Sequence, residues 1–168
     1  MVRQFVQQNN INNLNVGTMS NPLTINDCLN FEKRNNYHIG SNQIYCNICN
    51  QLSDSISTTK IYSTSHYLIM LLNIGVGKVY DVKLKFSSQI DISNYVKLKE
   101  EKQIFNLYGV ITHIGESGDS GHFVASCKSP VDNQWYQYND AFVNPIKDLE
   151  KEVFNFATPY ILFYEKEK

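Results

Sequence analysis

The sequence contains no long apolar run and no cluster of basic residues, and it carries little charge overall. Asp, Glu, Lys and Arg make up 18% of the 168 residues, and the net charge is −1. No stretch approaches the roughly 18 apolar residues of a membrane span. The scattered Lys and Arg residues do not form the electrostatic footprint of a nucleic-acid or anionic-lipid binder. We therefore expect neither a membrane nor a nucleic acid as a partner.

The sequence also lacks the features of a secreted protein. Its first residues, MVRQFVQQNN, contain no apolar core of a secretory signal. The four cysteines, at positions 28, 46, 49 and 127, are therefore expected to be reduced thiols of a cytoplasmic or nuclear protein.

Aromatic and apolar residues are plentiful. Hydrophobic residues make up 42% of the chain, with 11 Tyr and 9 Phe, a composition typical of a sheet-rich globular protein. The length suits one core. Residues 1–22 are crowded with Asn and Gln and predict a flexible lead-in, and residues 23–168 form the folded part. The predicted class is α+β, mainly antiparallel sheet with a few short helices.

The periodicity of the sequence predicts the elements of that sheet. Thr24 and Asp27 form a predicted capping box at the start of a helix. Residues 61–74 predict a strand whose apolar second half is buried and central, and residues 79–86 alternate as in a half-exposed strand. Further strands are expected at 104–114, 122–128, 134–139 and 159–166, with an amphipathic helix at 146–154.

His122 begins one of these strands and follows a run rich in glycine. The turn-rich residues 129–133 (SPVDN) indicate a hairpin, and if Lys128 pairs with Asn133, His122 lies opposite Asn139. Opposed Cβ atoms are roughly 4.5 to 5.5 Å apart, which allows a side-chain hydrogen bond. An amide that fixes the imidazole tautomer leaves the other ring nitrogen free to act as a base. An ordinary strand histidine is the alternative, and pairing geometry alone leaves it open.

The same register predicts the core of the hairpin. It places four side chains on the opposite side from His122, as a core face made by Phe123 with Tyr138 and Ala125 with Tyr136. Cys127 falls on that face and is expected to be a buried, inert thiol.

These residues and their neighbours in the sequence resemble those of a known protein family. The stretch EKQIFNLYGVITHIGESGDSGHFVASCKSPVDNQWYQYNDAFV, with PYILFYEK after it, resembles the histidine box of the ubiquitin-specific proteases, which are cysteine peptidases. Upstream, LTINDCLNFEKRNNYHIGSNQIYCNICN is similar to the family's Asp-Cys-Leu helix and Cys-x-x-Cys segment. The resemblance covers about residues 22–166, and it implies the palm and part of the fingers of a papain-like protease.

The resemblance also implies roles for individual residues. His122 would be the general base, Asn139 its orienter and Asp140 an accessory polar group. His113 matches a recurrent histidine just before the loop, and we expect it to be a structural, hydrogen-bonding histidine and not one with a chemical role. The implied substrate-binding loop, over the cleft that receives the ubiquitin tail, consists of Gly115, Glu116, Ser117, Gly118, Asp119, Ser120 and Gly121. Gly121 would permit close packing beside the base.

The sequence departs from the family at the nucleophile. The motif Gly-x-x-Asn-x-Gly-Asn-[Thr/Ser]-Cys, which carries the catalytic cysteine in the family, is absent from this chain, and Cys28 lies in a helix instead. We therefore expect the chain alone to be inactive. It would be either the C-terminal part of a thiol-dependent ubiquitin hydrolase or an inactive pseudoprotease that binds ubiquitin as a scaffold; an unrelated sheet domain is the third reading.

The cysteine and histidine spacing and the resemblance indicate which cofactors and partners to expect. Cys46 and Cys49 have the spacing of half a zinc site, but His38 and His66 do not complete a standard ligand pattern, so we expect no metal and no cofactor in this chain. Ubiquitin and ubiquitinated proteins are the expected partners. The apolar surface left by a missing half would also favour self-association.

Overall fold

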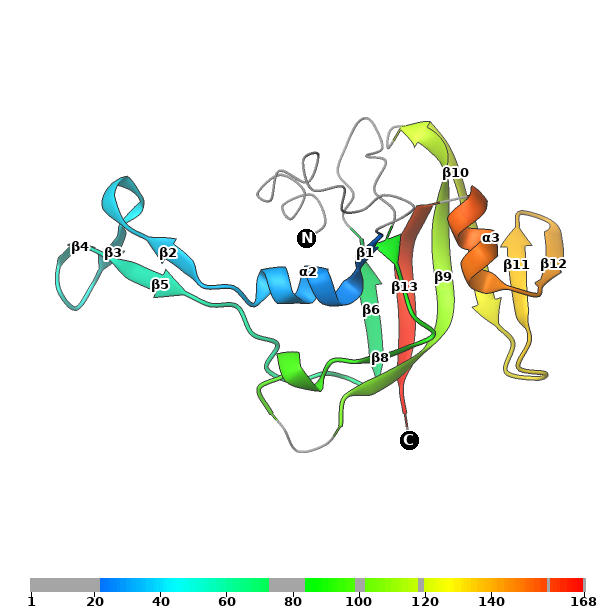
Figure 1. The fold of residues 1–168 in the computed structure, drawn as a ribbon, viewed down its shortest axis with the longest axis horizontal. Coiled ribbons are helices and arrows are strands. Elements are labelled where there is room, and N and C mark those ends of the chain that lie inside the picture. Colours follow the sequence, from blue (N-terminus) through cyan, green and yellow to red (C-terminus); the bar gives the residue numbers. More distant parts are fainter. Residues whose placement is uncertain (1–21, 73–83, 99–101, 118–119, 157, 168) are drawn as a thin grey trace.

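The computed structural model describes residues 22–72, 84–98, 102–117, 120–156 and 158–167. Its centre is an antiparallel sheet in which neighbouring strands follow the order β12, β11, β10, β9, β13, β6 (Figure 1). The strands are β12 (Phe142–Ile146), β11 (Trp135–Asn139), β10 (Ser120–Lys128), β9 (Ile104–Ser117), β13 (Thr158–Lys166) and β6 (Tyr67–Leu71). A further strand, β8 (Gln89–Asp91), pairs with β9 beside this row. The predicted fold class is confirmed.

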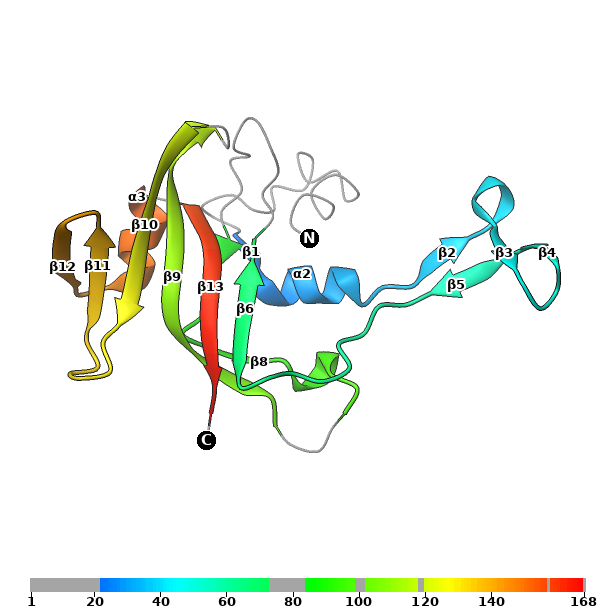
Figure 2. The ribbon, with the colours of Figure 1, turned by 180° about the vertical axis from the view of Figure 1, so that it is seen from behind.

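Two helices lie on one side of this sheet. Figures 1 and 2 show α2 (Ile25–Glu32) and α3 (Leu149–Phe156) on the same side, while the other side carries no helix among the residues that the structure describes. The side chains toward the helices form the core, among them Val110, Val124 and Leu162, each at most 2% exposed. The alternate side chains point to the open side, because successive strand residues face opposite ways.

The face predicted as the core of the hairpin is this open side. Phe123 is 54% exposed and Tyr138 43% exposed, whereas Val124 and Ser126 are buried. The prediction was wrong because both faces of β10 carry apolar residues, and the helices cover only one of them. Cys127 accordingly is half-buried, not fully enclosed.

The helix predicted at Thr24 is present with its cap. The Thr24 backbone N–H donates to Asp27 Oδ2 at 2.9 Å, and the Asp27 N–H donates to Thr24 Oγ1 at 3.1 Å. Both ends of the predicted capping box are thus made. The first turns bury Ile25, Cys28 and Leu29 against the sheet core.

Beyond α2 the chain forms a long arm of two hairpin-like ladders (Figure 1). The first pairs β2 (Asn36–His38) with β5 (Ser55–Ser57), and the second pairs β3 (Ile44–Cys46) with β4 (Gln51–Ser53). A short 3-10 helix, η2 (Gly40–Asn42), connects β2 to β3. We call residues 36–57 the arm.

Of the strand predicted over residues 61–74, the described part ends at residue 72, and residues 73 and 74 lie outside the described residues. Within residues 61–72 the strand is shorter than predicted: Tyr67–Leu71 form β6, which pairs with β13 at the end of the row, and Ile61 makes an isolated bridge to Val96. Tyr67, Ile69 and Leu71 are each more than half exposed, so the prediction of a buried central strand was wrong. An apolar run at a sheet edge looks the same in sequence as one at its centre.

The remaining elements are two short paired strands and a 3-10 helix. β1 (Leu23–Thr24) pairs in parallel with β7 (Leu84–Lys85), and the 3-10 helix η3 (Ser93–Tyr95) follows β8. Leu84 and Phe86 are buried around the exposed Lys85, as the predicted alternation requires, while residues 79–83 of that predicted strand lie outside the described residues. Apart from Pro22, so does the predicted lead-in of residues 1–22. Over the described ranges, no helix has the length and apolarity that crossing a membrane would need.

Candidate active site

His122 lies near the start of β10, beside the tip of the β9–β10 hairpin. It pairs with Ile114 of β9, and the register shifts between Ser120 and His122 at a bulge. From His122 onward the strand alternates regularly, so His122 shares the helix side with Val124 and Ser126. Its side chain is 43% exposed, which leaves it accessible at the rim of the core.

The predicted contact between His122 and Asn139 is present, although the predicted register is not. Lys128 pairs with Trp135 and not with Asn133, a shift of two residues. An even shift keeps every side chain on its face. Asn139 therefore lies diagonally across from His122, where long side chains still reach one another.

The hydrogen bond joins His122 Nε2 to Asn139 Oδ1 at 2.6 Å. A carboxamide oxygen can only accept, so Nε2 carries the hydrogen and donates it. In the neutral ring Nδ1 then holds the lone pair. The pair thus presents a base whose tautomer is set by its partner.

Asp140 is a second polar neighbour of the imidazole. Its Oδ2 lies 3.8 Å from His122 Nε2, and its side chain is 80% exposed. Asp140 has a φ of 51°, in the left-handed region that Asn, Asp and Gly tolerate best. This turn directs the carboxylate back toward the ring, although the exposed pair is weak.

Gly121 and Gly115 leave room for the ring of His113. A Cβ on Gly121 would lie 2.2 Å from His113 Nε2, and one on Gly115 would lie 3.0 Å from His113 Cε1. The His113 ring also contacts Phe123, with the ring centroids 4.9 Å apart and the rings tilted by 52°, and Phe123 contacts Tyr160 at a centroid distance of 5.3 Å. His113 therefore fills the space under the segment that leads into His122. The sequence predicted a structural role for His113 but not its close contact with Gly121. The glycines at positions 115 and 121 were the signal in the sequence that could have indicated this contact.

The other residues of the predicted loop are described only in part. Gly115, Glu116 and Ser117 end β9, Ser120 and Gly121 begin β10, and Ser117 pairs with Ser120. Gly118 and Asp119 lie outside the described residues.

Neither Cys28 nor Cys127 supplies a thiol to His122. Cys28 is 1% exposed in α2, where burial is the main cause that raises its pKa to about 11. Cys127 alternates onto the open side, opposite to His122, and burial raises the pKa of its thiol as well. Both groups are held protonated, which is the reverse of what a nucleophile needs.

Cys46 and Cys49 lie on the arm. The metal partners considered from sequence are engaged elsewhere: His38 Nε2 bonds Ser57 Oγ at 2.9 Å, and His66 Nε2 bonds Glu165 Oε1 at 2.9 Å. Across the described part of the chain, no three or more His, Cys, Asp or Glu side chains gather as a metal site. Two thiols do not fit a closed zinc site, which needs four ligands.

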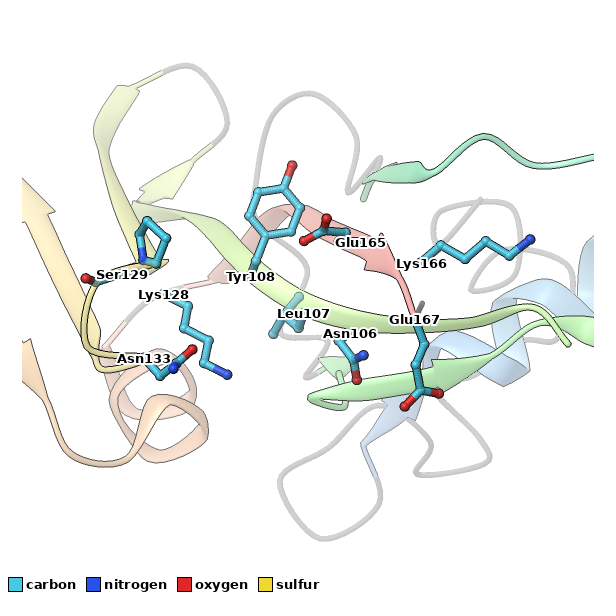
Figure 3. A pocket seen from close by; sticks show the side chains of 10 residues that line it. Asn106, Leu107, Tyr108, Lys128, Ser129, Asn133, Glu165, Lys166 and Glu167 are labelled. Atoms are coloured by element: carbon cyan, nitrogen blue, oxygen red, sulfur yellow. The ribbon is translucent and has the colours of Figure 1, made fainter.

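A hollow of about 550 Å³ lies at the far end of β10 (Figure 3). It is lined by Asn106, Leu107 and Tyr108 of β9, Lys128, the turn residues Ser129, Pro130 and Asn133, and Glu165, Lys166 and Glu167. Lys128 is six residues along the strand from His122, or roughly 20 Å at strand spacing. None of the predicted site residues lines this hollow.

Comparison with known proteins decides the family. The family model described as ubiquitin carboxyl-terminal hydrolase matches residues 3–164. The chain belongs to the ubiquitin carboxyl-terminal hydrolase family. The match begins inside the segment predicted as a lead-in, and the resemblance drawn from the histidine-box motifs is confirmed at the level of the family.

Curated relatives of this ubiquitin carboxyl-terminal hydrolase family member are much longer than the chain. It is 26% identical over 134 residues to ubiquitin carboxyl-terminal hydrolase 48 of Rattus norvegicus, which covers 76% of the chain and 12% of the relative. It is 27% identical over 126 residues to ubiquitin carboxyl-terminal hydrolase 10 of Saccharomyces cerevisiae, covering 72% of the chain and 16% of the relative.

Solved structures show the same fold. The SAGA Ubp8/Sgf11/Sus1/Sgf73 DUB module bound to ubiquitin aldehyde matches with a TM-score of 0.70 and 25% identity, over 87% of the chain and 34% of that chain. A second structure of this module, bound to monoubiquitin, matches with a TM-score of 0.71 and 25% identity, over 87% of the chain and 33% of that chain. The chain thus spans about a third of these structural neighbours.

Proposed function

We propose that this chain is the C-terminal, histidine-bearing part of a thiol-dependent deubiquitinase, with His122 as the general base and Asn139 as its orienter. The observation that carries the proposal is the 2.6 Å bond from His122 Nε2 to Asn139 Oδ1. It fixes the ring so that Nδ1 is the nitrogen able to take a proton. Family membership supports the reaction class, and the bond supports the assignment of roles.

The chemistry assigned to these residues is acyl transfer to a cysteine. A thiol placed beside Nδ1 of His122 gives up its proton to that nitrogen, and the thiolate attacks the carbonyl carbon of ubiquitin's C-terminal glycine. The protonated imidazole then gives this proton to the departing amine. Asn139 holds the ring through both transfers, and the exposed Asp140 carboxylate, 3.8 Å from His122 Nε2, is an accessory polar group beside it.

The thiol itself comes from outside residues 1–168 in this proposal. Cys28 and Cys127 are held protonated away from His122, and Cys46 and Cys49 lie on the arm. The chain also spans only about a third of the neighbouring structure's chain. A further part of the protein would have to pack near Nδ1 to complete the site, and the cleft between the two parts would receive the ubiquitin tail beside residues 115–121.

The test uses ubiquitin that carries a thiol-reactive group at its C-terminus. It is applied to the 168-residue chain and to any longer product of the same gene that contains it. We expect labelling of the longer product at a cysteine outside these 168 residues, and no labelling of the short chain. Labelling of the short chain at Cys28 or Cys127 would contradict the proposal.

Variants of the longer product test the roles. His122→Ala should abolish cleavage but leave ubiquitin affinity within a few fold, because a base acts in the transition state and not in ground-state binding. His66→Ala is the matched control, since His66 is an exposed histidine bonded to Glu165 in another part of the sheet. An equal loss of affinity and cleavage in His122→Ala would refute the assignment.

A scaffold that binds ubiquitin without cleaving it is the second candidate. The observation that favours it is the open side of the sheet, where apolar side chains such as Ile69, Phe123 and Tyr138 are exposed, together with the placement of Cys28 and Cys127 away from His122. Tight ubiquitin binding with no labelling of any product of the gene would decide for the scaffold.

A further inference from the structure

The β11–β12 hairpin places an exposed aromatic side chain beside the proposed orienter. Phe142 begins β12 and pairs directly with Asn139, so the two side chains share one side of the sheet. It is the side on which His122 bonds Asn139. Phe142 is 71% exposed. Single exposed aromatic residues are common on protein surfaces, so the significance of Phe142 comes from its place beside His122 and Asn139.

The hairpin holds Phe142 in a defined place. Only Asp140 and Ala141 lie between Asn139 and Phe142, and Asp140 adopts a φ of 51° in this turn. At the other end of the ladder Ile146 is buried. Because the strand is fixed at both ends, Asp140 and Phe142 keep a constant position next to His122. We call Asp140 and Phe142 the rim.

The charges around the rim favour a positively charged ligand. The Asp140 side chain is 80% exposed, and its Oδ2 lies 3.8 Å from His122 Nε2. Within residues 120–146 the only Lys or Arg is Lys128, roughly 20 Å along β10 from His122. Asp132, the other acidic residue in this range, lies in the turn at the far end of the strand. An aromatic face and a carboxylate both attract cations, so the rim suits an ammonium or guanidinium group.

The rim lies close to the place where the acceptor of ubiquitin would bind. In the proposed reaction the thiol lies at Nδ1 of His122, and the departing lysine amine takes its proton from the same nitrogen. Nε2 points the other way, toward Asn139 and the rim, so the part of the protein that carries the thiol does not need to cover the rim. Residues one and two places from the modified lysine lie about 3.5 and 7 Å along an extended chain. Their side chains therefore reach the groups around the imidazole.

We propose that Phe142 and Asp140 recognise a Lys or Arg side chain within two residues of the lysine that carries ubiquitin. The inference rests on the proposed function and names the class of acceptor that the site prefers. The cation packs on the Phe142 ring and faces the Asp140 carboxylate, whereas a Glu or Asp at the same place is repelled by that carboxylate. An exposed cation–π contact and an exposed ion pair are each weak, and together they correspond to about a 3- to 30-fold preference in kcat/KM.

The first measurement uses the 168-residue chain and needs no cleavage. Its NMR spectrum is recorded during titration with three peptides that carry Gly-Gly on a central lysine and have Arg, Ala or Glu on both sides of it. We expect the Arg peptide to shift the Phe142 ring and the Asp140 amide at lower concentration than the other two, and salt to weaken this effect. Equal shifts with the Arg and Glu peptides, or shifts only outside the β11–β12 hairpin, would overturn the proposal.

The second measurement uses the longer product of the gene with which the proposed function is tested. Ubiquitin is joined by an isopeptide bond to the same three peptides, and kcat/KM is measured for each substrate. Phe142→Leu keeps an apolar side chain but removes the ring, so the ratio of kcat/KM for the Arg substrate to that for the Glu substrate should fall about 2- to 5-fold. Phe142→Tyr keeps a ring and should retain the ratio.

Val143→Ala is the matched control. Val143 is also more than half exposed, but it is the next residue along β12 and so points to the opposite side of the sheet. It should leave the ratio unchanged. An Arg-to-Glu ratio near 1 in the unmodified protein, or a ratio that falls equally in Phe142→Leu and Val143→Ala, would overturn the proposal.

Ubiquitin joined to the small uncharged fluorophore aminomethylcoumarin reports on the proposed function by itself. Cleavage of this substrate without any difference between the peptide substrates would refute the role of the rim and leave the deubiquitinase function in place. No cleavage of any substrate would refute the proposed function, and the acceptor preference with it.

Discussion

Gly121 should tolerate no side chain, because His113 and the neighbouring backbone occupy the space that a Cβ needs. In Gly121→Ala the new carbon would lie 2.2 Å from His113 Nε2 and 2.6 Å from the carbonyl oxygen of Ile114. The φ of Gly121, +156°, is also rare for L residues. Overpacking costs about 1–3 kcal/mol and a rare backbone conformation a further 1–3 kcal/mol, so we expect a loss of about 2–6 kcal/mol.

Gly40→Ala is the matched control. Gly40 has a φ of +59°, but nothing lies within 4 Å of the point that an alanine Cβ would occupy there. It therefore reports the conformational cost alone, about 1–2 kcal/mol. The free energies of unfolding of both variants are measured in urea, and amide hydrogen exchange across β9 and β10 shows whether the damage is local to the segment before His122.

A double variant separates the two contacts. His113→Ala should recover part of the loss in Gly121→Ala, because it removes the ring atoms at 2.2 and 2.6 Å, but the Ile114 carbonyl at 2.6 Å remains. If Gly121→Ala costs no more than Gly40→Ala, or if removing His113 recovers nothing, then His113 does not determine the path of the chain into His122.

Three further predictions concern the cap, the buried thiol and the site. Thr24→Ala removes the cap of α2 and should lower the free energy of unfolding by about 1 kcal/mol in urea; a loss no larger than that of the exposed Thr58→Ala would contradict the cap's role. Because the folded-state pKa of Cys28, about 11, exceeds its ordinary value of 9.0, the folded state holds this proton more tightly, and stability should fall as pH rises from 9 toward 11. The loss should reach about 2–3 kcal/mol, and urea unfolding across this pH range should show a shallower decline in Cys28→Ala. Asn139→Ala removes the acceptor of the His122 Nε2–H, worth about 0.5–1.5 kcal/mol, so the preference for the Nε2-protonated tautomer should drop about 2- to 12-fold. The ¹⁵N chemical shifts of the His122 ring report the ratio of the two tautomers, with His66 as the internal reference. An unchanged ratio would contradict the role of Asn139 as the orienter.

Local signals in the sequence predicted the capped helix α2 and the strands around His122 well. The capping box at Thr24 and Asp27 depends on two residues three apart, and the structure makes both of its bonds. The strands around His122 and Asn139 depend on alternation and on a turn between them. Such signals involve short stretches of chain, so the sequence contains everything needed to recognise them.

The register of the hairpin could not be predicted in the same way. The turn closes over residues 129–134, where the Ser129 N–H donates to Gln134 O at 2.8 Å and the Asn133 N–H donates to Ser129 O at 3.0 Å. Asn133 adopts a φ of 59° within this turn. Because Lys128 pairs with Trp135, the loop is two residues longer than the predicted pairing with Asn133 implies. The contact of His122 with Asn139 survived because a shift of two residues preserves the face.

The sequence by itself determined the family, through motifs around His122 and Asn139, and it determined that these two side chains share one side of a sheet. Only the tertiary structure decided which side the helices cover, that β6 lies at the end of the row, and that His113 fills the space beside Gly121. Alternation distinguishes two faces of a strand, but both faces of β10 are apolar here. Which one is buried depends on where α2 and α3 pack, and that is set by contacts between residues far apart in the chain.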